Sequence, residues 1–187
     1  MLDKFNLQDA IYLPRKSVFL SGMGQECIEI KQYFREDEKN FIMWFYPGKK
    51  AMGPPGHCHG GLISAILDES MGFCCWLNGY LVMTAKMEVR YKAKIPIQNE
   101  YIATSRIKLK KGRRIIIEAE ITDSNGNVYA ISTGTFLAIS PGKLESPPEY
   151  AEQIKKAVHF FNLRQQGLSL KEIFKELSQD IDLPYCI

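Results

Sequence analysis

The chain has 187 residues, of which 45% are hydrophobic and 24% charged, and its formal net charge at pH 7 is +3. This composition is typical of one globular domain with room for a core, and it argues against a disordered chain. No apolar run approaches the ~20 residues of a membrane-spanning helix, and residues 1–8 lack the apolar segment of a signal peptide. We therefore expect a cytoplasmic protein without stable membrane insertion.

Short apolar runs predict strands near residues 27–33 and 41–46. The five cysteines lack the spacing of a disulfide framework, and Cys74 and Cys75 are adjacent in an apolar segment. Neighbours on one helix do not readily bridge each other, so the sequence predicts reduced, mostly structural thiols.

Residues 60–78 are expected to form a buried helix, because apolar residues leave no broad polar stripe on it. Asp68 and Glu69 are the exceptions. An ionised carboxylate is strongly disfavoured in a low dielectric unless it is paired or hydrogen-bonded, so at least one of the two is expected to have a chemical or interface role. The alternative is that Glu69 lies at a solvated rim and Asp68 caps a neighbouring backbone group.

The segment His59-Gly60-Gly61 opens this helix, nine residues before Asp68. Free N–H groups at a helix N-terminus suit a developing oxyanion or a bound phosphate, and glycine lets a ligand carbonyl approach the backbone closely. Nine residues advance ~13 Å along a helix and turn it by about 180°. One helix therefore cannot bring both ends to one substrate. Two antiparallel copies related by a two-fold axis can, which predicts a dimer with two composite sites.

The tripeptide His57-Cys58-His59 raises two other interpretations. Histidine and thiolate ligate zinc, but a fourth ligand at standard spacing is missing, and we expect no metal. A Cys58–His59 nucleophile pair is disfavoured because consecutive side chains seldom align for base activation.

After the helix, residues 82–91 alternate in polarity, which predicts a half-buried strand with Met83 on the apolar face and Thr84 on the polar face. Thr84 suits an interface site, or it is a β-branched residue chosen for strand packing. Further strands are expected over 101–109, 115–121 and 128–139, the last after a tight turn at 124–127. The resulting fold class is α+β, with one antiparallel sheet wrapped around one long central helix.

Residues 146–148, Ser-Pro-Pro, introduce a change to helical periodicity. One helix is expected to turn apolar residues inward: Tyr150, Ile154, Ala157, Val158 and Phe161. After Gly167, a capping box at Ser169 opens a second helix whose inward residues are Leu170, Ile173, Phe174 and Leu177. We divide the chain into a domain over residues 1–145, with an N-terminal lead-in, and a C-terminal helical extension over 146–187 that packs on the same domain or on the oligomer.

Several motifs together carry a family resemblance: G-P-P-G-x-x-H-G-G at residues 53–61, then Asp68, V-M-T-A at 82–85 and E-V-R-Y-K at 88–92. Over about residues 53–139 the chain resembles the hotdog-fold acyl-CoA thioesterases of the PaaI-like branch. It is particularly similar to the mammalian long-chain members of that superfamily and their bacterial relatives. The spacing from His-Gly-Gly to the acid, combined with the later threonine, is fairly specific.

The resemblance implies roles for five residues. The Gly60 amide, with Gly61 as a second candidate, would polarise the thioester carbonyl, and His59 would support that oxyanion site. Asp68 from the other subunit would act as general base on a water or as a nucleophile that forms a transient anhydride. Thr84 would help to place the water.

One position departs from several related subfamilies, which have Asn or Gln where this chain has Gly53. Long-chain members share glycine there, and His57 is a further candidate for the missing contact. Glu69, beside the acid, is placed with the substrate-binding residues.

Six basic residues gather in the expected hairpin: Arg106, Lys108, Lys110, Lys111, Arg113 and Arg114. They form either a solvated tip or a site for the phosphates of coenzyme A, for which Lys111 and Arg113 are the named candidates, with Arg90 and Lys92 as second ones. Nucleic acid is not expected, because aromatic residues do not interleave with these basic ones.

We therefore expect a homodimeric or homotetrameric acyl-CoA thioesterase that releases free acid and CoA without a metal or redox cofactor. One alternative is a non-catalytic acyl-CoA-binding sensor that uses the same pocket. Another is a hotdog dehydratase of hydroxyacyl thioesters, although the extended motif of that branch around the histidine is absent. The C-terminal extension is a candidate lid over an acyl tunnel.

Overall fold

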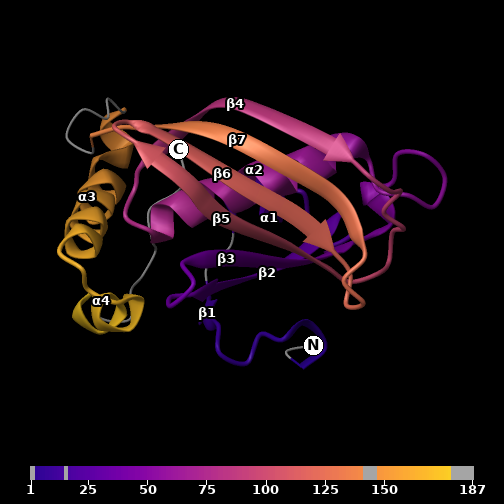
Figure 1. The fold of residues 1–187 in the computed structure, drawn as a ribbon, viewed down its shortest axis with the longest axis horizontal. Coiled ribbons are helices and arrows are strands. Elements are labelled where there is room, and N and C mark those ends of the chain that lie inside the picture. Colours follow the sequence, from indigo (N-terminus) through magenta and orange to yellow (C-terminus); the bar gives the residue numbers. More distant parts are fainter. Residues whose placement is uncertain (1–2, 15–16, 141–146, 178–187) are drawn as a thin grey trace.

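A computed structural model describes residues 3–14, 17–140 and 147–177 of the chain. One seven-stranded antiparallel sheet curves around a long helix, α2 (Gly60–Leu77), with the strand order β1-β2-β3-β5-β6-β7-β4 (Figure 1). The strands are β1 (Ile11–Leu13), β2 (Ile28–Arg35), β3 (Asn40–Pro47), β4 (Val82–Tyr91), β5 (Tyr101–Lys111), β6 (Arg114–Thr122) and β7 (Val128–Ala138). The predicted α+β class, with a sheet wrapped on one helix, is confirmed.

The core lies between α2 and the face of the sheet that α2 covers. Alternate residues of the central strands point into it, such as Ile115 and Ile117 of β6, and α2 contributes Ile66 and Met71. This inward alternation follows from the period of two of a strand, so that burial of one face fixes the register.

One side of α2 stays open, which the sequence did not predict. Most residues of the helix are buried, but Gly61, Ala65, Asp68, Glu69 and Gly72 are exposed or only half-buried. Their spacing of three to four residues places them along one stripe of the helix. The side of α2 opposite the sheet therefore presents small residues and two carboxylates; we call it the open stripe.

Strand β4 borders the open stripe and differs from its predicted pattern. The pairing with β7 shifts between Thr84 and Lys86, so that Ala85 is the extra residue of a β-bulge. Thr84 contacts α2 on one side of the bulge and Tyr91 does so on the other, although the two belong to opposite faces in a regular strand. Met83 is 61% exposed instead of lying on a buried face. The predicted face assignment is wrong before the bulge, because the bulge reverses the alternation, and it is confirmed after the bulge, where Met87 and Val89 pack against the core.

The N-terminal lead-in contains short elements that the sequence did not predict: the 3-10 helix η1 (Asp3–Phe5), strand β1 and helix α1 (Val18–Gly22). Phe5 and Leu7 pack in a second, smaller cluster with Trp44 of β3. Ser17 caps α1 by accepting a hydrogen bond from the Leu20 N–H at 3.1 Å. A further 3-10 turn, η2 (Lys49–Ala51), precedes the loop to α2.

The C-terminal extension contains η4 (Pro148–Tyr150), α3 (Ala151–Gln165) and α4 (Leu170–Glu176), which lie at one end of the molecule (Figure 1). The predicted capping box of Ser169 and Glu172 is confirmed. Tyr150, predicted to point inward, is exposed, because the buried face of α3 begins only at Ala157. The proposed domain boundary at 145/146 falls outside the described residues.

Candidate functional site

The Asp68 carboxylate lies between α2 and β4. Its Oδ1 accepts a hydrogen bond from the Thr84 hydroxyl at 2.9 Å. Both residues line a pocket of about 160 Å³, whose other walls are Glu69, Gly72, Trp76, Val82, Met83 and Phe136. Predicted to sit in a buried helix, Asp68 is only half-buried and lies on the open stripe. A hydrogen-bonded carboxylate in a pocket that has both polar and apolar walls is an arrangement that suits a general base.

The start of α2 provides one backbone donor. His59 is the N-cap residue, and its Nδ1 accepts the Gly61 N–H at 3.0 Å. The Gly61 amide is therefore already paired, and the structure does not support it as a donor to a ligand. Among the described residues, the Gly60 N–H has no acceptor, so that it is the unpaired donor at this helix end. A neutral His59 that accepts at Nδ1 carries its proton on Nε2.

Tyr91 holds the first turn of α2 and was not predicted as a site residue. Its hydroxyl donates to the Gly60 carbonyl oxygen at 3.1 Å and lies 2.6 Å from the Ser64 hydroxyl. Since Tyr91 is on β4, these bonds tie the helix start to the same strand that carries Thr84. The sequence offered one signal for Tyr91 as a site residue, which is its position in the motif at residues 88–92.

The loop before α2 contains Gly53 and His57, and its geometry limits what each can do. A Cβ on Gly53 would lie 3.0 Å from both Cα and Cδ2 of His59, so no larger side chain fits there unless His59 moves. The His57 Nδ1 lies 2.8 Å from the Pro55 carbonyl oxygen, and only a protonated Nδ1 bonds to a carbonyl. A neutral His57 then offers an acceptor, not a donor, at Nε2. In this neutral form, His57 has no donor left for a second contact to the substrate carbonyl.

Glu69 lies on the other flank of the open stripe. Its carboxylate accepts a hydrogen bond from Ser17, which itself caps α1. Ser17 thereby connects the lead-in to α2, and Glu69 also lines the Asp68 pocket.

The basic candidates divide between the two ends of α2. Arg90, paired with Glu88, and Lys92 flank Tyr91 beside the helix start. Lys111 and Arg113 lie at the β5–β6 hairpin, where Arg113 donates to the Ala138 carbonyl at 3.1 Å. Ala138 pairs with Val82, which follows the C-terminal end of α2.

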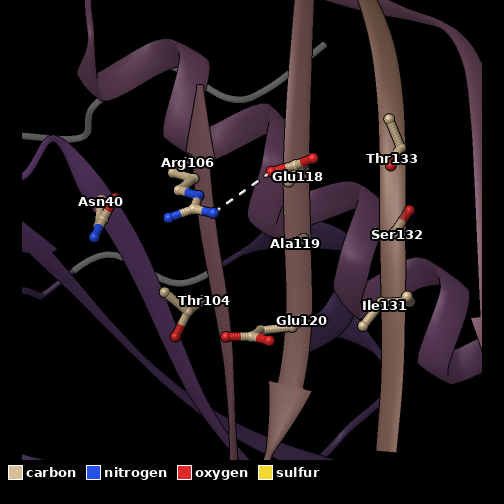
Figure 2. Close-up of a pocket in the computed structure, with 9 residues that line it drawn as sticks. All are labelled: Asn40, Thr104, Arg106, Glu118, Ala119, Glu120, Ile131, Ser132 and Thr133. Atoms are coloured by element: carbon tan, nitrogen blue, oxygen red, sulfur yellow. Dashed lines mark ion pairs between the residues drawn. The ribbon is translucent and has the colours of Figure 1, made fainter. Parts of the chain in front are cut away.

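Two other hairpin residues have partners on the outer face of the sheet. Arg106 and Lys108 both form ion pairs with Glu118, and the hydrogen bond from Lys108 is the main cause of the lowered pKa of that carboxyl group. A pocket of about 370 Å³ surrounds Arg106 and Glu118, on the face of the sheet away from α2 (Figure 2). These ion pairs favour the interpretation that Arg106 and Lys108 belong to a solvated surface and not to a site for the CoA phosphates.

The Cys58 thiol is buried next to His59 and is not a candidate nucleophile. Burial raises its pKa to about 12, and nearby Cys27 adds to the shift. At pH 8 only about one molecule in 10⁴ then carries the reactive thiolate. All four cysteines among the described residues are free.

We expect Cys58 to resist alkylation while the chain is folded, because the shift leaves so little thiolate and the side chain is covered. Iodoacetamide at pH 8, followed by peptide mass mapping, is expected to modify half-buried Cys27 about 100-fold faster than Cys58. Unfolding in urea should remove the difference. Equal labelling of the two in the folded chain would contradict the assignment.

Comparison with known protein families finds a similar family for the central part of the chain. Residues 55–130 match the family model described as Thioesterase superfamily. Over this part, which is less than half of its length, the chain is similar to the thioesterase superfamily. The matched region includes the helix start, Asp68, Thr84 and Tyr91, so that the predicted motifs all fall inside it or at its edge.

Curated relatives agree with this placement. Acyl-coenzyme A thioesterase THEM4 of Rattus norvegicus is 28% identical over 123 residues, which cover 65% of this chain and 52% of the rat protein. Acyl-coenzyme A thioesterase THEM5 of Mus musculus is 28% identical over 126 residues, 66% of this chain and 49% of that protein. A Candida albicans protein, named as uncharacterized and mitochondrial, is 32% identical over 100 residues, 51% of this chain and 44% of its own. The chain thus spans about half the length of these relatives.

Solved structures are similar to this chain in fold. Protein RHA08564, a thioesterase superfamily protein, is 26% identical with a TM-score of 0.56, covering 58% of this chain and 53% of its own. The E. coli PaaI protein is 16% identical with a TM-score of 0.55, covering 65% and 83%. The BH2602 protein of Bacillus halodurans, solved with CoA, is 21% identical with a TM-score of 0.54, covering 67% and 78%.

Proposed function

We propose that this chain is an acyl-CoA thioesterase, which hydrolyses an acyl-CoA to a free acid and CoA. The observation that carries the proposal is the Asp68 carboxylate, which accepts a hydrogen bond from the Thr84 hydroxyl in a pocket on the open stripe of α2. Relatives named acyl-coenzyme A thioesterases and a structural neighbour solved with CoA support it.

In the proposed reaction, Asp68 takes a proton from a water molecule whose oxygen adds to the thioester carbonyl carbon. The Gly60 N–H donates to the oxyanion that forms, and the partial positive charge of the helix start stabilises it. The tetrahedral intermediate then breaks its C–S bond. The CoA thiolate leaves and takes the proton from Asp68, so that acid and thiol are both accounted for.

Asp68 has a second route, in which its carboxylate attacks the carbonyl and forms an anhydride that water later hydrolyses. A single turnover in ¹⁸O-labelled water detects an anhydride that water opens at the Asp68 carbonyl carbon. With a general base, the label enters only the product acid. Label in Asp68 itself would establish the anhydride.

We propose a two-fold dimer as the unit that forms complete sites. In one chain Gly60 and Asp68 are eight residues apart on α2, which is ~12 Å along the axis. The open stripe and the edge strand β4 lie on the same side, since Thr84 and Tyr91 both bond to α2. An uncovered strand edge with an exposed Met83 is a surface that favours association. Antiparallel packing of two stripes would bring Gly60 of one copy to Asp68 of the other.

The same arrangement accounts for the divided basic residues. In an antiparallel pair, the hairpin with Lys111 and Arg113 would approach the partner's helix start, where Arg90 and Lys92 lie. We propose this mixed group as the site for the CoA phosphates.

The first test is thiol release by the purified chain across short, long and aromatic acyl-CoAs, with the mass of the oligomer measured by light scattering. Turnover by a dimer or tetramer is the expected result. Binding of acyl-CoA with no turnover on any thioester would replace the thioesterase with a non-catalytic acyl-CoA-binding protein.

Thr84→Val is expected to lower kcat about 10-fold while leaving the melting temperature almost unchanged. Valine keeps the β-branched shape but loses the hydroxyl that donates to Asp68, and a hydrogen bond to a charged group contributes about 1.5 kcal/mol or more. Thr133→Val, on the outer face of the sheet, is the matched control. Equal turnover in the two variants would mean that Thr84 serves strand packing alone.

The proposed reaction uses no metal or redox cofactor. Within residues 3–14, 17–140 and 147–177, no three His, Cys, Asp or Glu side chains gather as metal ligands, and no helix there is long and apolar enough to cross a membrane.

A cytoplasmic location stays a prediction, because a fungal relative is named mitochondrial.

A further inference from the structure

The pocket beside Asp68 is small, so its walls decide what fits. Its volume is about 160 Å³, against ~300–1,000 Å³ for typical ligand pockets. The walls that are apolar come from β4, from Phe136 of β7 and from Trp76 of α2. Such a pocket accepts the carbon atoms next to a reacting carbonyl, while the remainder of an acyl-CoA lies outside it.

Trp76 lies two helical turns beyond Asp68, toward the C-terminal end of α2, and lines the pocket there. Aromatic residues of α3 pack behind it. The ring centroid of Phe161 lies 5.0 Å from that of Trp76 in an edge-to-face contact, and that of Phe160 lies 6.4 Å away. Both phenylalanines are fully buried, and the tryptophan is 3% exposed. The indole therefore lines the pocket on one side and packs against these two rings of α3 on another.

Arg164 fixes α3 in this position. Its Nε donates to the Leu77 carbonyl oxygen at 2.8 Å, at the last turn of α2, and its Nη1 pairs with Glu36. A Cβ on Gly79 would lie 3.1 Å from Cβ of Arg164, so the chain after α2 passes closely against α3. Since α3 cannot shift without losing these contacts, Trp76 has little freedom to swing aside.

We infer that Trp76 is the wall that limits the size of the acyl group beside Asp68, and that the C-terminal extension determines this limit by holding the indole in place. The inference rests on the proposed thioesterase function. No described residue of the extension lines the pocket itself, so these helices act as a support behind the wall and not as a lid over the mouth. Phe160 and Phe161 are thus positioning residues.

Two substitutions in the pocket are expected to have opposite effects. Trp76→Phe shortens the wall and should raise kcat/KM for a longer acyl-CoA relative to a shorter one by about 10-fold. Gly72→Ala should lower the same ratio, because a Cβ there meets nothing within 4 Å and enters the pocket. Unchanged ratios in both variants, with wild-type turnover present, would overturn the inference.

Phe161→Leu tests the role of the extension, because this residue touches Trp76 but does not line the pocket. It should raise the ratio of kcat/KM for a longer acyl-CoA to that for a shorter one, as Trp76→Phe does. His159→Ala, on the exposed face of α3, is the control and should leave this ratio unchanged. A purely structural role would lower the melting temperature of Phe161→Leu and leave the ratio unchanged, which would overturn the positioning role.

Calorimetric binding of the same acyl-CoAs separates this inference from the proposed function. If the wild-type chain hydrolyses no thioester, the thioesterase proposal fails. The ratio of Kd values for long and short acyl-CoAs should still shift in Trp76→Phe, and an unchanged ratio of Kd values would overturn the inference as well.

Discussion

Asp68→Asn is expected to fold and assemble like the wild-type chain and to lose turnover by ~10²-fold or more. The amide has the same shape and still accepts the hydrogen bond from Thr84, but it cannot take a proton from water. Thiol release from the preferred acyl-CoA measures the loss, and the melting temperature checks the fold.

Glu120→Gln makes the same chemical change on the outer face of the sheet, beside Thr104, and should keep full activity. If Asp68→Asn also keeps full activity, the carboxylate is neither base nor nucleophile, and the proposed mechanism is wrong.

Gly60→Pro is expected to lower kcat by ~10²–10³-fold without unfolding the helix. Proline removes the one N–H assigned to the oxyanion, and loss of a single such donor has an effect of this size. The site tolerates proline, since it is the first helical position and His59 before it has φ −66° and ψ 134°, which is the extended conformation that a residue before proline prefers.

Gly60→Ala is the matched control, because it adds the Cβ but keeps the N–H. That Cβ would lie 3.7 Å from the Tyr91 ring, an ordinary contact, so alanine should stay within a few-fold of the wild-type rate. An equal loss in both variants would assign the effect to space and not to the missing donor.

The two inactive variants also test the composite site when they are mixed. If Gly60 of one copy works with Asp68 of the other, random exchange of Asp68→Asn and Gly60→Pro chains gives mixed dimers with one intact site each. Activity should then recover to about a quarter of the wild-type value. A mixture that stays inactive after exchange would place both residues in the site of a single chain, or show that they do not act together.

Local pattern was sufficient for much of the fold. The boundaries of α2, the strands around the β5–β6 turn and the capping box at Ser169 were all predicted, because periodicity, turn residues and caps act within a few positions. The family resemblance also covered the region that matches the family model, and it drew attention to Asp68 and Thr84, which the structure joins by a hydrogen bond.

Other features depended on contacts between distant segments. The bulge at Ala85 reversed the faces of β4, and a polar–apolar alternation does not reveal an inserted residue. The donor at the helix start was decided by the His59 ring, which takes the Gly61 N–H and leaves that of Gly60. Neither the bulge nor the pairing of the Gly61 N–H can be predicted from the order of residue types alone.

The sequence alone determined that this chain forms a sheet around one helix and that a carboxylate lies in that helix, since hydrophobic period and local turn chemistry specify such elements. Only the tertiary structure decided which side of α2 stays open, that Tyr91 bonds to Gly60 and that α3 supports Trp76. These contacts join residues 31 and 85 positions apart, and their formation depends on how whole elements pack, for which no single stretch of sequence carries a signal.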